Sequence, residues 1–243
     1  MKKLISLLLS LSLITGLNIS AQDLGVDEIL TNFFETIGQK NLLKVQTITF
    51  TGKVIQMGME LPFKMIQKRP GKYYMEAEFQ GAKIKQAVDG ETGWMVMPMS
   101  GSMEPNDISG PQLDAMKEQA DIDGYLWKWK EMGFQLELVG TEEMEGSQVY
   151  NLKLTKKDGA VDNYYIDKEN FVLLKVKNKL VIQGTEIEQE TLCSNYKSVS
   201  GVLIAHNLEQ RANGQNMATI TVDTTVFDLD VDDSLFIKPV VAK

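Results

Sequence analysis

The sequence has one cysteine, Cys193, and one histidine, His206. A single thiol excludes a disulfide framework and any metal site built from several thiolates, and a single imidazole excludes a histidine-rich metal centre. Basic residues are also scarce, since 25 lysines and arginines face 33 aspartates and glutamates and leave a net charge of −8. Nucleic-acid binding depends on basic side chains that neutralise phosphates, so this balance argues against nucleic acid as a partner.

Catalytic motifs are missing as well. The chain has no G-x-S-x-G, no H-E-x-x-H and no glycine-rich phosphate loop. A turn at Ser200-Gly201 would place Asn195 opposite His206 and Cys193 diagonally across, and a thiol beside an imidazole can act as a nucleophile. No orienting group accompanies this pair, and a free cysteine is more often a buried apolar residue. The sequence therefore makes no positive case for an enzyme, a metal site or a cofactor.

Residues 1–21 have the features of a secretory signal peptide. Lys2 and Lys3 supply the positive start, residues 4–17 form an apolar stretch, and Ala21 offers a small residue for cleavage. The apolar stretch is shorter than the ~20 residues that a membrane span needs, although an uncleaved anchor is the alternative interpretation. We expect an exported, soluble chain of residues 22–243 with a net charge of −10, located in the periplasm.

From Val45 onward, apolar and polar residues alternate with the period of two that is typical of half-buried β-strands. Tight-turn pairs separate the runs, and such pairs flanked by alternation indicate hairpins. The pairs are Gln80-Gly81, Asp89-Gly90, Glu145-Gly146, Asp158-Gly159, Ser200-Gly201 and Asn213-Gly214. The pattern predicts about ten strands in one antiparallel sheet that curls or closes, within a single domain over residues 22–243.

Two regions depart from the strand pattern. Val26 to Lys40 has apolar residues at helical spacing and Gly38 near its end, which predicts a helix. Pro98 to Met132 is rich in proline and glycine, and it predicts two short helices, from Gln112 to Gln119 and from Gly124 to Glu131. A long insertion of this kind is typical of a functional lid. Helices that plug one end of a barrel as core are a second, compatible interpretation.

Methionine is abundant, with 13 residues in the chain. It lines surfaces that must accept variable apolar shapes, and a curved sheet beneath a helical lid would enclose a cavity suited to acyl chains. Plain core filling is the alternative. Tyr125 and Trp129 are four residues apart on one helix face, and they are candidates either to cover such a ligand or to pack in the core. The methionines assigned to the cavity are Met57, Met59, Met65, Met75, Met95, Met97, Met99 and Met116.

Arg69 lies in the run from Gln67 to Lys72, where one strand ends and the next begins. Arginine carries five donors in a rigid fork. At the mouth of an apolar cavity, this side chain would bind the carbonyls of a lid helix and hold the lid shut. An exposed charge in a turn is the alternative.

The order of these motifs resembles the LolA family of periplasmic lipoprotein carriers. The family pattern is a strand that ends in K-R-P, an aromatic and apolar strand, and then D-G-x-T-x-W followed by a proline. The matching residues are Lys68-Arg69-Pro70, then Tyr73 and Met75, then Asp89 to Trp94 and Pro98. The ending Val231 to Pro239 is similar to the tail of LolA-like proteins, and Ser100 to Asp123 matches no part of the family pattern.

This resemblance implies an incomplete antiparallel β-barrel of about eleven strands, with short helices as a lid over an apolar cavity. It implies a carrier that takes lipid-modified proteins from an inner-membrane exporter to an outer-membrane acceptor. By matched position, Arg69 would gate the lid and Tyr73 would lie in the loading region. Trp94 is assigned with Tyr73 to the cavity and its loading region. The absence of a lipobox cysteine fits the soluble carrier. A lipid-binding sensor or regulatory module of the envelope, or a carrier of another lipid, is the alternative.

Overall fold

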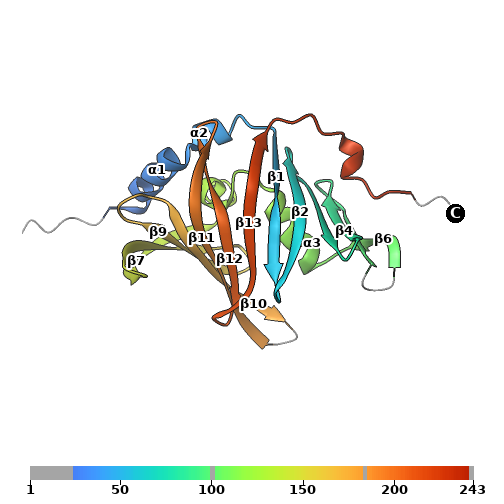
Figure 1. Cartoon of the computed structure of the whole chain (residues 1–243). Helices are drawn as coiled ribbons and strands as arrows, with labels where there is room; N and C mark the ends of the chain where they lie inside the picture. The colour runs from blue at the N-terminus through green and yellow to red at the C-terminus, as the bar shows by residue number, and fades with distance from the viewer. Residues whose placement is uncertain (1–23, 99–101, 183–184, 241–243) are drawn as a thin grey trace, which may run out of the picture.

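The computed structural model describes residues 24–98, 102–182 and 185–240. This part of the chain is mainly β, with a few short helices (Figure 1). The helices are α1 (Val26–Ile37), α2 (Gln39–Leu42), α3 (Pro111–Ala120), α4 (Tyr125–Lys128) and the 3₁₀ turn η2 (Asp233–Leu235). The strands are β1 (Thr47–Gln56), β2 (Met59–Lys68), β3 (Lys72–Phe79), β4 (Ala82–Val88), β5 (Gly93–Met97), β6 (Ser102–Ile108), β7 (Gln135–Met144), β8 (Ser147–Thr155), β9 (Val161–Asp167), β10 (Leu173–Ile182), β11 (Thr185–Val199), β12 (Val202–Ala212) and β13 (Gln215–Phe227).

All thirteen strands of the described residues form one antiparallel sheet, in the order β6-β5-β4-β3-β2-β1-β13-β12-β11-β10-β9-β8-β7. Each half of the sheet is a meander, and the pairing of β1 with β13 joins the halves. The six predicted turn pairs all lie between successive strands, which confirms the hairpin prediction. The sheet is curved and does not close, as the incomplete barrel predicts, but it has two more strands than expected.

The additional strand β6 lies inside the segment that we expected to interrupt the sheet. Pro98 and Pro105 break the strand pattern in the sequence, yet β6 is an edge strand, where a proline is tolerated because one side of the strand needs no hydrogen-bonded partner. The expected helices are present as α3 and α4, although α4 is shorter than predicted. Since β6 and β7 are the two edges, the connection that carries α3 and α4 crosses from one edge of the sheet to the other.

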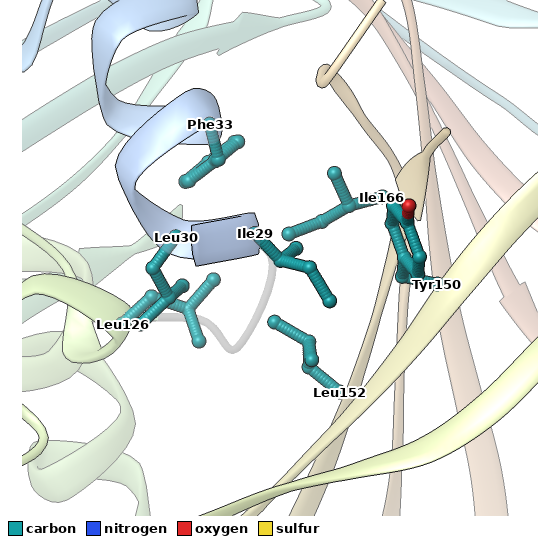
Figure 2. Packing of buried hydrophobic residues seen from close by; sticks show 7 residues of the cluster. All are labelled: Ile29, Leu30, Phe33, Leu126, Tyr150, Leu152 and Ile166. Atoms are coloured by element: carbon teal, nitrogen blue, oxygen red, sulfur yellow. The ribbon is translucent and has the colours of Figure 1, made fainter. Parts of the chain in front are cut away.

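The helices cover one face of the sheet, which we call the lid face. Strand alternation and register place three packed clusters on this face. Figure 2 shows the cluster at the β8–β9 end, where Ile29, Leu30 and Phe33 of α1 meet Leu126 of the α4 segment. A second cluster at the centre includes Ile122 from the loop after α3. The third lies beneath α3, on β3 and β4.

The opposite face, which we call the tail face, is crossed near β1–β5 by residues 228–240 (Figure 1). Phe236 of this tail is 1% exposed and packs against Ile66, Tyr74 and Trp94. The indole Nε1–H of Trp94 donates to the Phe236 carbonyl at 2.9 Å. The predicted motif from Val231 to Pro239 therefore forms a strap across the sheet.

The predicted helix from Val26 to Lys40 is divided into two. Gly38 adopts a left-handed conformation with φ of 73°, which ends α1 and begins α2. The Asn41 side chain of α2 then donates to the Gly201 carbonyl at 3.1 Å, and this contact fixes α2 to the β11–β12 hairpin. The N-terminal helices are thereby held over the half of the sheet that α3 does not cover.

Candidate functional site

Five of the predicted cavity residues come together beneath α3. They are Met65, Tyr73, Met75, Met95 and Met116, and they pack with Val88, Ile108, Leu113 and Ala120. Strand alternation explains the grouping, because the residues from β2, β3 and β5 all point to the lid face. The result is an apolar, methionine-rich surface covered by a helix that carries its own methionine.

The helix α3 approaches β5 closely. Gly93 begins β5, and a β-carbon at that position would lie 2.8 Å from Cδ1 of Leu113 in α3. Only glycine allows the helix to sit this near the strand without displacement. The lid is therefore packed directly on the sheet, and side chains fill the space between them.

Arg69 connects the end of β2 to the lid. Its Nη1 donates to Oδ2 of Asp123 at 2.7 Å and its Nη2 donates to Oδ1 at 2.5 Å, which is the two-pronged geometry that a guanidinium forms with a carboxylate. Its Nε donates to the Val45 carbonyl at 2.8 Å. Asp123 lies in the loop between α3 and α4. Its Nη2 also donates to the carbonyl of Leu42, the last residue of α2, at 3.3 Å. Arg69 therefore binds one helix carbonyl, as predicted, but its two-pronged acceptor in the lid is a carboxylate that was not predicted.

A carbonyl of α3 is bound by a neighbouring side chain. Gln67 is two residues before Arg69 and on the same face of β2, and its Nε2 donates to the Gln119 carbonyl at 2.6 Å. Sequence reasoning missed both Gln67 and Asp123. We call the contacts of Gln67 and Arg69 with the lid the latch.

The latch is an electrostatic contact that is mostly shielded from water. The side chain of Asp123 is 8% exposed and that of Arg69 is 21% exposed. The hydrogen bond and charge of Arg69 hold the pKa of Asp123 below its usual value, and Lys128 adds to this effect from 3.3 Å. The Asp123 carboxylate likewise raises the pKa of Arg69. Both groups are therefore charged at neutral pH.

The other half of the sheet also contacts the lid through a charged side chain. The Nζ atom of Lys156 lies 3.0 Å from Asp162 of β9 and 3.2 Å from Glu118 of α3. It also lies 4.8 Å from the centre of the Tyr125 ring. Burial raises the pKa of Glu118 above its usual value, and burial raises the pKa of Tyr125 to about 12. The lid is thus held by side chains from both halves of the sheet.

Several predicted cavity residues lie elsewhere. Trp94 neighbours Met95 on β5, so alternation sends it to the tail face, and its assignment to the cavity is wrong. Met57 is 84% exposed in the β1–β2 turn, with φ of 51°, and it too is wrongly assigned. Met59 and Met97 are about 40% exposed at strand ends. Met99 lies outside the described residues.

Trp129 lies at a hollow of about 230 Å³ between α1 and α4. Tyr125 lies away from it and meets Phe134 edge-to-face, with ring centres 5.5 Å apart. The hollow is lined by Asp27, Leu30, Thr31, Phe34, Leu126, Trp127, Trp129 and Lys130. A second hollow, of about 500 Å³, lies on the tail face beside β4 to β6 and Pro239. Neither hollow lies beneath α3.

Cys193 and His206 are both buried on adjacent strands. Burial raises the pKa of Cys193 to about 11, which disfavours the thiolate, and Nδ1 of His206 lies 2.9 Å from the Ile204 carbonyl. Within the described ranges, no three His, Cys, Asp or Glu side chains are grouped to hold a metal ion. In the same ranges, no helix is long and apolar enough to cross a membrane.

No known protein-family model matches this sequence, and no curated protein matches it. Solved structures do share its fold. A LolA superfamily protein from Nitrosomonas europaea aligns with a TM-score of 0.60 at 13% identity, over 89% of this chain and 99% of that one. A domain from Vibrio parahaemolyticus, provisionally described as an outer-membrane lipoprotein-sorting protein, aligns with a TM-score of 0.56 at 13% identity, over 86% and 97%.

A DUF1329 family protein from Desulfovibrio piger gives the same TM-score, identity and coverage as the Vibrio domain. All three matches span most of both chains. The fold of this protein is therefore LolA-like, as the sequence motifs predict. At this level of identity, the likeness establishes the fold alone.

Proposed function

We propose that this protein is a periplasmic carrier that binds the acyl chains of lipid-modified proteins on its lid face and delivers them towards the outer membrane. The observation that carries the proposal is the methionine-rich surface beneath α3, closed by a latch that Arg69 makes with Asp123. The LolA-like fold, shared with a domain described for lipoprotein sorting, supports the same function.

The driving force for binding is the burial of methylene groups, at about 0.8 kcal/mol for each CH₂. Acyl chains that leave a membrane need an apolar enclosure during transit through water. Methionine side chains are unbranched and adaptable, so they can repack around chains of different length. Met65, Met75 and Met116 provide such side chains on the sheet and on the lid itself.

The latch explains how a carrier can release its cargo. In this closed form, side chains occupy the space beneath α3, so loading requires the lid to move and the latch to break. When the latch re-forms, it stabilises the empty, closed state and so favours release of the cargo. The apparent affinity for cargo is weaker than the intrinsic affinity, because only the small fraction of molecules with an open lid can bind.

The proposed setting follows from the signal peptide expected over residues 1–21, which lie outside the described residues. An exported carrier between two membranes would receive cargo from an inner-membrane exporter and pass it to an outer-membrane acceptor. The net charge of −8 disfavours nucleic acid as a competing partner. No catalytic step is part of this proposal.

The direct test is the Arg69→Leu variant in a binding and transfer assay with a fluorescent triacylated lipopeptide. A hydrogen bond to a charged group contributes about 1.5–3 kcal/mol, and each 1.4 kcal/mol is about a tenfold change in affinity. We therefore expect the variant to bind the lipopeptide about ten to a hundred times more tightly and to transfer it to acceptor vesicles more slowly.

Lys68→Leu is the matched control, because Lys68 precedes Arg69 but faces the tail. Unchanged loading and release in Arg69→Leu would refute the latch. Failure of the wild-type protein to bind any acyl probe would refute the carrier. Binding without transfer, together with co-purification of a regulatory membrane protein, would favour the alternative function as a sensor.

A further inference from the structure

The hollow between α1 and α4 is lined by five aromatic and aliphatic side chains, with Asp27, Thr31 and Lys130 as its polar residues. Phe34 of α1 and Trp127 of α4 meet edge-to-face, with ring centres 4.9 Å apart. Trp127 is 40% exposed. An ion pair between Asp27 and Lys130, at 2.9 Å, bridges the two segments, and both side chains are more than half exposed.

This hollow is continuous with the buried cluster of the lid face. Leu30 and Leu126 line the hollow, and the same two residues are 4% and 5% exposed members of the cluster on β8 and β9. Figure 2 shows them side by side, with Leu152 and Ile166 to the right, beyond Ile29. A displacement of Leu126 would therefore open a path from solvent directly to the apolar lid face.

The segment of residues 125–132 is built to move as a unit. It is bounded by Gly124 and Gly133, which have positive φ values of 75° and 67°. The backbone hydrogen bonds at its ends join residues within 124–134, for example Trp127 to Gly124 and Phe134 to Trp129. Side chains therefore attach it to its surroundings. Leu126 and Trp127 pack on the strands and on α1, and Lys130 pairs with Asp27. At its base, Lys128 pairs with Asp121 at 2.6 Å, and Tyr125 lies under Lys156. Such a segment opens at lower free energy than one held by a backbone ladder.

The helix α3 is held differently. Gln67 binds its last turn and Lys156 binds Glu118 from the opposite half of the sheet. Leu113 and Met116 are packed on β3 to β5. The lid thus consists of α3, which packs directly on the strands, and of residues 125–132, which side-chain contacts hold between two glycines.

We propose that the hollow between α1 and α4 is the port through which the acyl chain enters, and that residues 125–132 are the flap that opens it. This inference rests on the proposed function. It places the point of access at the β8–β9 end of the lid face, the face on which the methionine-rich surface also lies. At about 230 Å³ the hollow is below the ~300–1,000 Å³ typical of ligand pockets. It therefore admits the end of one chain, and the flap must swing out for the remainder.

A reversible crosslink across the port tests this assignment. Asp27→Cys and Lys130→Cys place two exposed thiols at the ends of the ion pair, and a short reducible bis-maleimide joins them. Cys193 is buried and does not compete. The matched control joins Asp107→Cys to Lys238→Cys, which replaces an ion pair of 2.9 Å on the tail face. Loading is followed with cis-parinaric acid, which fluoresces in apolar surroundings.

We expect the port crosslink to slow loading by at least about tenfold, with full recovery after reduction, and we expect the control crosslink to leave the rate unchanged. Equal loading of the crosslinked and reduced protein would overturn the port and leave the carrier intact. Equal slowing by both crosslinks would also overturn it, because the effect would not be local to the port. Absence of binding to every form, including wild type, would reject the carrier and the port together.

Discussion

Two covers lie on the sheet, the C-terminal tail on one face and the helical lid on the other. Lys68 and Arg69 are neighbours in the chain, yet each attaches a different cover. Lys68 donates to the Val231 carbonyl at 2.6 Å and pairs with Asp233 at 2.7 Å, so it fixes the tail. Arg69 turns to the other face and binds the lid at Asp123. The two covers therefore share one strand end, and the alternation of β2 decides which residue serves which cover.

The covers differ in what holds them. The tail inserts Phe236 into the sheet among aromatic and aliphatic side chains, and the Trp94 indole adds a buried hydrogen bond. The lid relies on charged and polar contacts around an adaptable methionine-rich surface. A buried aromatic anchor suits a permanent attachment, whereas polar contacts can be exchanged for water when the lid opens. Under the proposed function, the tail is therefore the structural cover and the lid is the cover that moves.

The largest expected effect comes from removing the anchor of the tail. Phe236→Ala deletes a side chain that is 1% exposed, and substitutions of this kind typically destabilise a protein by about 3–5 kcal/mol. The free energy of unfolding in urea should fall by that amount, while acyl binding below the transition should persist. An unchanged urea midpoint would show that the tail is not part of the cooperative fold.

The coupling across the latch should be smaller. In a double-mutant cycle of Arg69→Leu and Asp123→Leu, we expect a coupling energy of about 1–2 kcal/mol, because the pair is charge-assisted but partly reached by water. Urea unfolding of the four proteins gives this value. A coupling energy near zero would mean that the two side chains meet without stabilising the closed lid.

Acid should weaken the latch. Arg69 lowers the pKa of Asp123, and a carboxylate with a depressed folded-state pKa stabilises the fold fully above its unfolded pKa of about 3.9. This contribution is lost as the pH falls through the folded-state pKa. Acrylamide quenching of tryptophan should therefore rise below about pH 4, and Asp123→Asn should remove this transition. Burial raises the pKa of Glu118, so the protonation of Glu118 affects stability in the opposite sense. This effect of Glu118 should persist in Asp123→Asn.

The smallest effect is expected for the exposed contacts of the tail. Lys68 and Lys72 lower the pKa of Asp233 to about 2, but the Asp233 side chain is 55% exposed. Pairs of this kind contribute little to stability. Lys72→Met should leave the urea midpoint and acyl binding unchanged within error. A loss of stability as large as that of Phe236→Ala would contradict the proposal that the buried aromatic anchor holds the tail more strongly than its exposed ion pairs.

The hairpins were predictable because their turns are chemically specific. Asp89-Gly90 is an example, since the Asp89 carboxylate accepts from the backbone N–H groups of Glu91 and Thr92. The edge strand β6 was not predictable from the same rules, because Pro105 indicates a break unless the strand is known to lie at an edge.

The candidate site was predictable in part. Met65, Tyr73 and Met75 fall on one face, and alternation could also have separated Trp94 from Met95. No sequence pattern marks Gln67 or Asp123 as a latch residue. Their roles depend on contacts between distant residues, and Arg69 and Asp123 are 54 positions apart. Such long-range polar contacts are set by the packing of α3, which the sequence of the insertion does not specify.

The most direct test of the central claim is to map where an acyl chain binds. A lipopeptide with a diazirine on its acyl chain is bound to the wild-type protein, activated by light and located by peptide mass spectrometry. We predict adducts on the lid face, around Met75, Met95 and Met116, and at Trp127. Adducts confined to the tail-face hollow, at Lys83 or Met103, would contradict the account.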